Sequence, residues 1–474
     1  MVVYDTGSDW LTVKACLTDQ HCNKKIDKKK TMQKLGPDAA AAMEDEEEVK
    51  KLLKSDKEVE VTEGHPTGEP AQGSEEDSDN SGDGVLSPFS SQAKEKESKK
   101  QLTPEYQPDV VYTANKSMTG HTASSLGFPL SYGSADLNGF KYADVVCLNP
   151  LAYSSLKEVT PQVLKENFCI KDFKYQAVME AKGLDGCDGI LGLSPKDYGS
   201  HSILPMLKRN GLISRLLISF SNAFHESSFK SKFHEDRQSY MVFGGYNESQ
   251  IVGGANGLFS MPLASKDLNS AKFWGVEGQG FMYGDKWVFD PEKDEPILAV
   301  IDSGTTLVIL PYRVYEGLMM GIADKVRDDP SISFVCTRDQ KSRDLGPCYF
   351  NNTRCEDITD KLEPMRFIFG GVVYEIKIQA FLKDVQNEGM VTAPPAPPKA
   401  GETYTGGCMF ELRPSKDKDE PPGSQEHRFL MGNTFLKNFV SVYDYDQQQV
   451  KLGVSVHSEA LAKAYPYKKG QFHR

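Results

Sequence analysis

Two short motifs in the chain each place an Asp where a carboxyl group could do chemistry. Each motif is an Asp, a hydroxyl residue, a Gly and a second hydroxyl residue, and each follows a short apolar run. The two copies are Asp5, Thr6, Gly7 and Ser8, and Asp302, Ser303, Gly304 and Thr305. We expect a buried strand to deliver each Asp to a sharp turn, which the Gly permits and the hydroxyl groups brace by hydrogen bonding the carboxylate. A single copy of this motif could occur by chance, but two copies behind apolar runs indicate that the two Asp residues form a pair.

Two carboxyl groups held about 3 Å apart would form a catalytic pair, because like charges that close share one proton. The ionised member can take a proton from a water molecule while the protonated member donates to the carbonyl oxygen of a peptide bond. Asp5 and Asp302 would titrate as a unit, so the sequence does not say which of them is ionised. This chemistry needs no metal, and we expect no cofactor.

The elements that must position these residues form a weak internal repeat. Ile190-Leu191-Gly192 follows the first Asp motif, and Leu430-Met431-Gly432 follows the second. Strand patterns dominate both halves, and Tyr132-Gly133 precedes an Asn138-Gly139 pair that is typical of a hairpin. The repeat predicts a mainly β protein with two similar lobes, whose Asp turns meet at a pseudo-symmetry axis.

The length and charge of the chain limit its organisation and its partners. A chain of 474 residues is too long for one ordinary core. We expect an N-terminal lobe over 1–256, a C-terminal lobe over 257–456 and a loose polar tail over 457–474. The net charge of −12 argues against a nucleic-acid partner. No stretch approaches the roughly 18 uncharged apolar residues of a membrane span.

Residues 23–104 differ sharply in composition from the rest of the chain. They contain Lys clusters, acidic runs and a tract rich in Gly, Ser, Asp and Glu. This pattern predicts a low-complexity, disordered insertion in the N-terminal lobe. A partner-binding or cleavable segment is the alternative.

The nine Cys residues indicate disulfides rather than zinc, because none are spaced as Cys-x-x-Cys. Proximity in the sequence suggests the pairs Cys147–Cys169 and Cys336–Cys348. Three glycosylation sequons begin at Asn115, Asn247 and Asn351. Together these features indicate an oxidising, secretory-route environment.

These elements, in this order, resemble the pepsin-like (cathepsin D-type) aspartic proteases. The resemblance implies a bilobal acid protease fold with a cleft between two barrel-like lobes. It also implies a catalytic pair at Asp5 and Asp302, a flap at Tyr132 and Gly133, and an aspartic endopeptidase that acts on polypeptides at acidic pH. The matching disulfides would be Cys16–Cys22 and Cys355–Cys408.

The resemblance further implies a preference for bulky apolar residues near the scissile bond. We expect Ile190, Val300 and Leu307 to contribute to the substrate pockets. We also expect a monomer that is secreted or resides in a lysosome- or vacuole-like compartment. The alternative is a relative that binds a peptide or protein on the same scaffold without cutting it.

The chain departs from the family pattern in four places. The family has further strands and a propeptide before the first Asp, so we expect this chain to be a fragment that has lost upstream sequence and its targeting signal. The Trp that hydrogen-bonds the flap Tyr in the family would fall on Thr12, whereas Trp10 stands two positions earlier. Cys187 replaces an aromatic residue that is common in the cleft wall. The fourth departure is the insertion.

Overall fold

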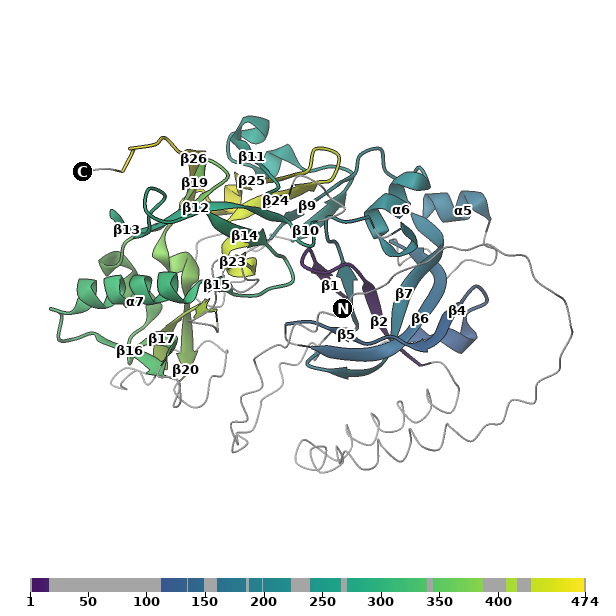
Figure 1. Cartoon of the computed structure of the whole chain (residues 1–474), viewed down its shortest axis with the longest axis horizontal. Coiled ribbons are helices and arrows are strands. Elements are labelled where there is room, and N and C mark those ends of the chain that lie inside the picture. The colour runs from purple at the N-terminus through teal and green to yellow at the C-terminus, as the bar shows by residue number, and fades with distance from the viewer. Residues whose placement is uncertain are drawn as a thin grey trace, which may run out of the picture.

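The computed structural model describes residues 2–16, 112–133, 135–148, 160–184, 187–197, 199–222, 239–265, 271–338, 344–386, 406–415 and 428–472. The predicted insertion at 23–104 lies outside these residues, as does Cys22 of the expected Cys16–Cys22 disulfide. The described chain is mainly β, as predicted, and forms two lobes connected by a shared sheet (Figure 1). Within the described residues, no helix is long and apolar enough to cross a membrane.

The N-terminal lobe is built on an eight-stranded sheet. Its main strand order is β1-β8-β2-β7-β6-β4, with β3 paired to β2 and β5 paired to β6. The strands are β1 Val2–Asp5, β2 Leu11–Cys16, β3 Tyr112–Thr113, β4 His121–Gly127, β5 Leu130–Ser131, β6 Asp136–Cys147, β7 Cys169–Lys182 and β8 Gly189–Gly192. All four residues of β8 are buried, which explains why this stretch is a continuous apolar run rather than an alternating one. Two short helices, α5 (Pro161–Glu166) and α6 (Ile203–Arg209), complete the lobe.

The C-terminal lobe contains a nine-stranded sheet and a four-stranded sheet. The larger sheet has the order β22-β15-β23-β14-β12-β18-β19-β26, with β13 paired to β12, and the smaller has the order β16-β17-β21-β20. The larger sheet consists of β12 Gly275–Tyr283, β13 Lys286–Phe289, β14 Ile297–Ile301, β15 Val308–Leu310, β18 Met365–Phe369, β19 Val372–Ile376, β22 Leu412–Pro414, β23 Arg428–Met431 and β26 Ala462–Pro466. The smaller sheet consists of β16 Ser333–Arg338, β17 Leu345–Asn351, β20 Leu382–Gln386 and β21 Gly406–Phe410.

Helices cover parts of the C-terminal lobe. The longest is α7 (Tyr312–Val326), and α8 (Cys355–Ile358) and α9 (Asn433–Leu436) are single turns. The buried residues of α7 recur three or four positions apart, so one stripe of the helix faces the core. They are Tyr312, Val314, Tyr315, Leu318, Met319, Ile322 and Val326.

A five-stranded sheet joins the two lobes. Its order is β10-β9-β24-β25-β11. The strands are β9 Leu217–Ser221, β10 Tyr240–Phe243, β11 Leu258–Pro262, β24 Phe439–Asp444 and β25 Gln449–Val454. Strand β9 from the first half of the chain pairs antiparallel with β24 from its end. The expected lobe boundary at 256–257 is therefore bridged by backbone hydrogen bonds within one sheet.

The internal repeat predicted from the sequence corresponds to a three-strand unit that occurs twice. Strand β1 lies parallel to β8 while β2 lies antiparallel to it, and β14, β23 and β15 repeat the same arrangement. The Gly of each apolar-apolar-Gly segment allows close backbone approach. A Cβ at Gly192 would lie 2.4 Å from the backbone of Asp9, and one at Gly432 would lie 2.2 Å from the carbonyl oxygen of Leu307.

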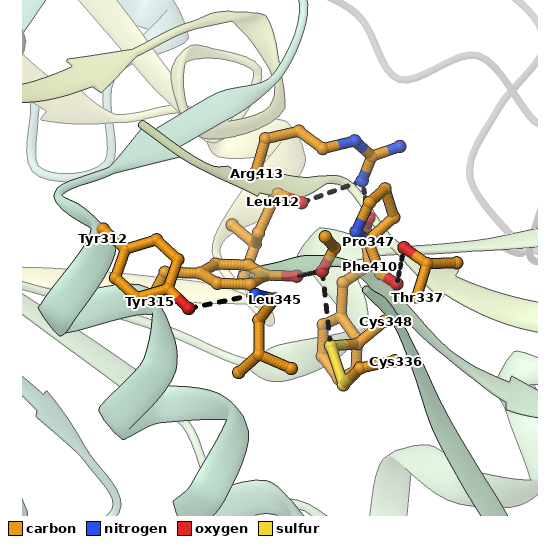
Figure 2. Close-up of a disulfide and its surroundings, with 11 residues drawn as sticks. Tyr312, Tyr315, Cys336, Thr337, Leu345, Pro347, Cys348, Phe410, Leu412 and Arg413 are labelled. Carbon is orange, nitrogen blue, oxygen red and sulfur yellow. Dashed lines mark hydrogen bonds between the residues drawn. A yellow bond between two sulfur atoms is a disulfide. The ribbon is translucent and has the colours of Figure 1, made fainter. Parts of the chain in front are cut away.

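Three disulfides are present among the described residues: Cys147–Cys169, Cys336–Cys348 and Cys355–Cys408. Three of the four predicted pairings are therefore confirmed, and the fourth, Cys16–Cys22, lies partly outside the described residues. Figure 2 shows the hairpin that Cys336–Cys348 closes and its ties to α7. Tyr315 donates a hydrogen bond to the Gly346 carbonyl at 2.9 Å, and the Leu345 amide donates to the Tyr312 hydroxyl at 2.9 Å.

Part of the C-terminal tail is ordered, so the expectation of a loose tail over 457–474 is wrong for this part. Strand β26 extends the larger sheet by pairing antiparallel with β19. Beyond it, the ring of Phe472 packs edge-on against Trp287 with centroids 6.0 Å apart. The tail looked polar in the sequence because it contains several Lys residues and Glu459, whereas the strand itself is formed by Ala462–Pro466.

Truncation after Leu461 is expected to destabilise the protein. It removes β26 and the contact with Trp287, so β19 becomes an unpaired edge. We expect a loss of about 2 kcal/mol of unfolding free energy, measured by urea unfolding. Lys463→Ala, which changes only an exposed side chain of the same strand, is the control. A truncated chain as stable as the full chain would contradict this role.

Candidate active site

The two Asp motifs lie at the ends of equivalent strands. Asp5 ends β1, and Asp302 directly follows β14. Each carboxyl group accepts a hydrogen bond of 2.8 Å from the amide of the Gly two residues later, Gly7 and Gly304 respectively. Both Asp residues are 8% exposed. The repeat in the sequence therefore corresponds to a repeated local geometry.

The two turns pack against each other's carboxyl groups. A Cβ at Gly7 would lie 2.8 Å from Oδ1 of Asp302, and a Cβ at Gly304 would lie 2.1 Å from Oδ1 of Asp5. Only Gly leaves room for the opposite carboxyl at these distances. The structure thus brings together two residues that stand nearly 300 positions apart, and both glycines serve the opposite turn as well as their own.

Hydrogen bonds between the loops hold this arrangement. The Thr6 amide donates to the Ser303 hydroxyl at 3.1 Å, and the Ser303 amide donates to the Thr6 hydroxyl at 2.9 Å. Each hydroxyl also donates across the interface, Thr6 to the Ile301 carbonyl at 3.1 Å and Ser303 to the Tyr4 carbonyl at 2.8 Å. Sequence reasoning assigned these hydroxyls to bracing carboxylates, whereas their partners are the backbone and hydroxyl of the other loop.

The outer hydroxyls of the two motifs differ. Thr305 donates a 2.6 Å hydrogen bond to Oδ2 of Asp302, as expected. The buried Oγ of Ser8 has no hydrogen-bond partner among the described residues, although it is close enough to lower the pKa of Asp5. The pair is therefore asymmetric, with Asp302 bound more firmly than Asp5.

Burial is the largest cause of an upward shift that brings the pKa of Asp5 to about 7, and the charge of Asp302 is the next. The hydrogen bond from the Gly7 amide and the nearby Ser8 hydroxyl lower the pKa of Asp5 but do not cancel this rise. At acidic pH, Asp5 therefore carries a proton beside the second carboxyl group. This is the state that a proton-sharing pair requires.

Residues of α9 support the second loop from behind, and sequence reasoning did not identify them. The Asn433 side chain donates to the Ser303 carbonyl at 2.9 Å, and its amide donates to the Thr305 carbonyl at 2.8 Å. The Thr434 hydroxyl donates to the Thr306 carbonyl at 3.0 Å. They could have been found from the sequence because they directly follow Gly432, the Gly of the second apolar-apolar-Gly segment.

The predicted flap residue lies near the first Asp. Tyr132 follows β5 in the hairpin with β6, and its amide donates to the Ala135 carbonyl at 2.7 Å. The pKa of Tyr132 is raised, first by burial and then by the charges of Asp5 and Asp9. Tyr132 therefore lies near the first Asp loop, while Gly133 is exposed at the turn.

Thr12, at the position where the family's Trp would stand, is fully buried. Its hydroxyl accepts a 3.1 Å hydrogen bond from the Ile190 amide and so braces the pairing of β2 with β8. Thr12 lowers the pKa of Tyr132 from nearby, as Ser8 does. The flap Tyr thus rests among hydroxyl groups rather than against an indole.

The three predicted pocket residues differ in accessibility. Val300 is 1% exposed and Ile190 is 6% exposed, so neither offers much surface to a substrate. Ile190 belongs to a small apolar cluster against which Tyr132 and Cys187 pack. Leu307 is half-buried and stays a predicted pocket residue. In this structure, the prediction for Val300 has no support.

The structure also contains a hollow of about 550 Å³ away from the Asp pair. Its lining consists of Leu148, Phe168, Leu212, Ile213, Ser214, Phe243 and Gly244. Apart from the Ser214 hydroxyl, these side chains are apolar. Among the described residues, no group of three or more His, Cys, Asp or Glu side chains could hold a metal ion.

Comparison with known proteins gives a consistent family signal. The family model described as eukaryotic aspartyl protease matches residues 92–455, which include Asp302 and Tyr132 but not Asp5. Plasmepsin I of Plasmodium falciparum is 21% identical over 349 residues, covering 72% of this chain and 58% of that protein. Gastricsin of Cavia porcellus is 21% identical over 363 residues, covering 72% of this chain and 71% of that protein.

A fungal relative and a solved structure agree with these matches. Vacuolar protease A of Aspergillus fumigatus is 25% identical over 344 residues, covering 72% of this chain and 67% of that protein. The crystal structure of an aspartic proteinase from Irpex lacteus matches with a TM-score of 0.50 and 18% identity, covering 74% of this chain and 86% of that one. The structural match supports the fold. The chain spans 58% of the matched plasmepsin's length.

Asp5→Asn is expected to change how stability depends on pH. The ordinary pKa of 3.8 rises to about 7 in the folded protein, so the native state binds more protons than the unfolded state between those values. The contribution of Asp5 to stability therefore falls as pH rises through this window, by up to roughly 4 kcal/mol. Urea unfolding at pH 4, 5.5 and 7 should show the variant gaining stability relative to wild type as pH rises.

The matched control is Asp172→Asn, which removes an exposed carboxylate at a left-handed backbone position that Asn tolerates. It should keep the wild-type pH dependence. If Asp5→Asn and Asp172→Asn give parallel curves, Asp5 does not hold a proton in the folded protein.

A graded series of Gly→Ala variants tests the cross-packing of the loops. Gly304→Ala should be the most destabilising, by about 2 kcal/mol or more, because its Cβ would lie 2.1 Å from the Asp5 carboxyl. Gly7→Ala should destabilise the protein less, because its Cβ would lie 2.8 Å from the Asp302 carboxyl. Gly127→Ala should have the smallest effect, because nothing lies within 4 Å of its Cβ. Thermal unfolding gives the order. An equal effect at Gly304 and Gly127 would mean that the loops do not meet.

Proposed function

Because this chain belongs to the eukaryotic aspartyl protease family, we propose that it is an aspartic endopeptidase with Asp5 and Asp302 as its catalytic pair. The observation that supports this most directly is the cross-packing of the two loops, each Gly lying against the opposite carboxyl group. The family implies a polypeptide substrate. The raised pKa of Asp5 supplies the shared proton that the reaction needs.

The proposed reaction uses the pair as both base and acid. The ionised carboxylate takes a proton from a water molecule as the water oxygen attacks the carbonyl carbon of the peptide bond. The protonated carboxyl group donates its proton to the carbonyl oxygen, which gives a neutral tetrahedral intermediate. When the C–N bond breaks, the carboxyl group that was protonated by the water donates that proton to the leaving nitrogen and becomes ionised again. The other carboxylate takes a proton from a hydroxyl group of the intermediate, which becomes the carbonyl of the new carboxylic acid.

The loop hydrogen bonds would keep the two carboxyl groups in place during this exchange. Thr6 and Ser303 fix the backbone of both turns, and Thr305 fixes the plane of Asp302. Positioning of this kind lowers the barrier because little reorganisation is needed when charge moves. Tyr132 would close over an extended peptide and exclude water from the pair.

We propose an oxidising, acidic compartment on the secretory route as the working environment. The three disulfides fit such a compartment. Asn247, which begins one of the glycosylation sequons, is exposed. One relative is named as a vacuolar protease, and a raised pKa at Asp5 favours work at acidic pH. Preference for bulky apolar residues near the cleaved bond completes the proposal.

The proposed activity should appear as cleavage of a denatured protein at about pH 4. The rate should fall as pH rises through about 7, because Asp5 then loses the proton that the pair shares. Asp302→Asn should lower the rate about a thousandfold or more, since an amide cannot act as an acid or base. A statine-type transition-state mimic should inhibit the wild type. Product analysis by mass spectrometry measures all three effects.

Asp172→Asn is again the matched control and should cleave at the wild-type rate. Cleavage that survives Asp302→Asn, or that the mimic does not reduce, would reject the proposal. Capture of a peptide without any cleavage would instead favour the non-catalytic relative considered from the sequence.

A further inference from the structure

Four side chains form an aromatic and cationic cluster beside the first catalytic loop. Trp10 stacks on His201 with ring centroids 3.9 Å apart and an interplanar angle of 6°. Phe128 meets Trp10 edge-on at 4.7 Å. The Nζ of Lys141 lies 5.4 Å from the Trp10 ring centroid and 4.6 Å from that of Phe128. We call these four residues the Trp10 cluster.

The Trp10 cluster connects the first catalytic loop to the base of the flap. Trp10 ends the loop that begins at Asp5, and its carbonyl accepts a 3.0 Å hydrogen bond from the Gly192 amide. The Phe128 amide donates to the Gly139 carbonyl at 2.7 Å, which closes the base of the flap hairpin. Lys141 lies on β6, the returning strand of that hairpin. Trp10 therefore contacts both sides of the flap base.

The fourth member, His201, lies among charges from three elements. Lys141 on β6 and Lys174 on β7 lower its pKa, while Asp197 in the loop before it raises it. Asp197 is itself paired with Arg209 of α6 at 2.9 Å. Burial is the largest cause and acts with the lysines, so the pKa of His201 falls to about 4. His201 is thus a neutral ring above that pH.

We propose that Trp10 is a positioning residue that anchors the base of the flap to the first catalytic loop, and that protonation of His201 releases this anchor. The inference rests on the proposed function, because flap position matters only if the chain cleaves peptides. The proposal gives Trp10 and His201 a role at the base of the flap. At the position where the family's Trp would meet the flap Tyr, this chain has Thr12.

Protonation of His201 should release the anchor because it adds positive charge to the Trp10 cluster. Lys141 already provides one cation beside the Trp10 ring, and a protonated His201 would add a second cation facing Lys141 and Lys174. Repulsion and the cost of burying the new charge both oppose the stack. The stack should therefore loosen as pH falls through about 4, which places a lower pH limit on activity in addition to the upper limit set by Asp5.

Trp fluorescence tests the stack without reference to activity. The chain has three Trp residues, and the part of the emission that disappears in Trp10→Phe reports on Trp10. In the wild type this emission should change in one step with a midpoint near pH 4. His201→Phe should abolish the step, and Lys141→Met should move it to higher pH by removing repulsion. His121→Gln, at an exposed His, is the control and should retain it.

Kinetics test the link to the flap. Wild-type kcat/KM should fall below pH about 4, and His201→Phe, which keeps an aromatic ring but cannot be protonated, should remain active at lower pH. His201→Ala removes the stack and should lower kcat/KM about tenfold at pH 5, more than His201→Phe does. If a different group were responsible for the fall in kcat/KM at low pH, His201→Phe would lose activity at the same pH as the wild type.

The outcomes separate this inference from the proposed function. An inactive wild type that still shows the fluorescence step would reject the protease proposal and leave the stack established. An active wild type without the step, or with the same acid limit in His201→Phe, would overturn the role of His201. Unchanged kcat/KM in His201→Ala would overturn the anchoring role of Trp10.

Discussion

The rest of the structure depends on holding two carboxyl groups of like sign together in a buried site. Such an arrangement is unfavourable unless the groups share a proton and their backbones cannot move apart. Thr6 and Ser303 meet the second condition by exchanging hydrogen bonds between the two loops. The repeated three-strand units then fix each loop from behind, because β8 and β23 pair with the strands on both sides of each turn.

Much of this could be predicted from the sequence because the features are local. Each Asp motif and each apolar-apolar-Gly segment leaves a pattern within a few residues, and Cys336 and Cys348 are only 12 positions apart. The exchange between Thr6 and Ser303 leaves none, since its partners are almost 300 positions apart. Likewise, Val300 looked like a pocket residue beside Asp302, but position in the sequence does not show that its strand is covered on both faces.

The shared sheet was also beyond sequence reasoning. A division into 1–256 and 257–456 follows the repeat, yet β9 pairs with β24 across that division. The strands of this sheet are ordinary apolar runs whose partners cannot be read from composition. The tail was wrongly expected to be loose for the same reason, because β26 pairs with β19 through backbone hydrogen bonds that depend little on side-chain type. Pairing between strands that are far apart along the chain cannot be predicted from a single sequence.

This topology has a consequence for the life of the chain before it is complete. The first Asp loop precedes the second by nearly 300 positions, the amide of Asp302 is held by the Met431 carbonyl, and β9 pairs with β24. A nascent polypeptide emerging from the ribosome therefore contains both Asp residues before it contains the strands that hold their loops in place. For the proposed protease, the order of translation itself would keep an unfinished chain from digesting its neighbours.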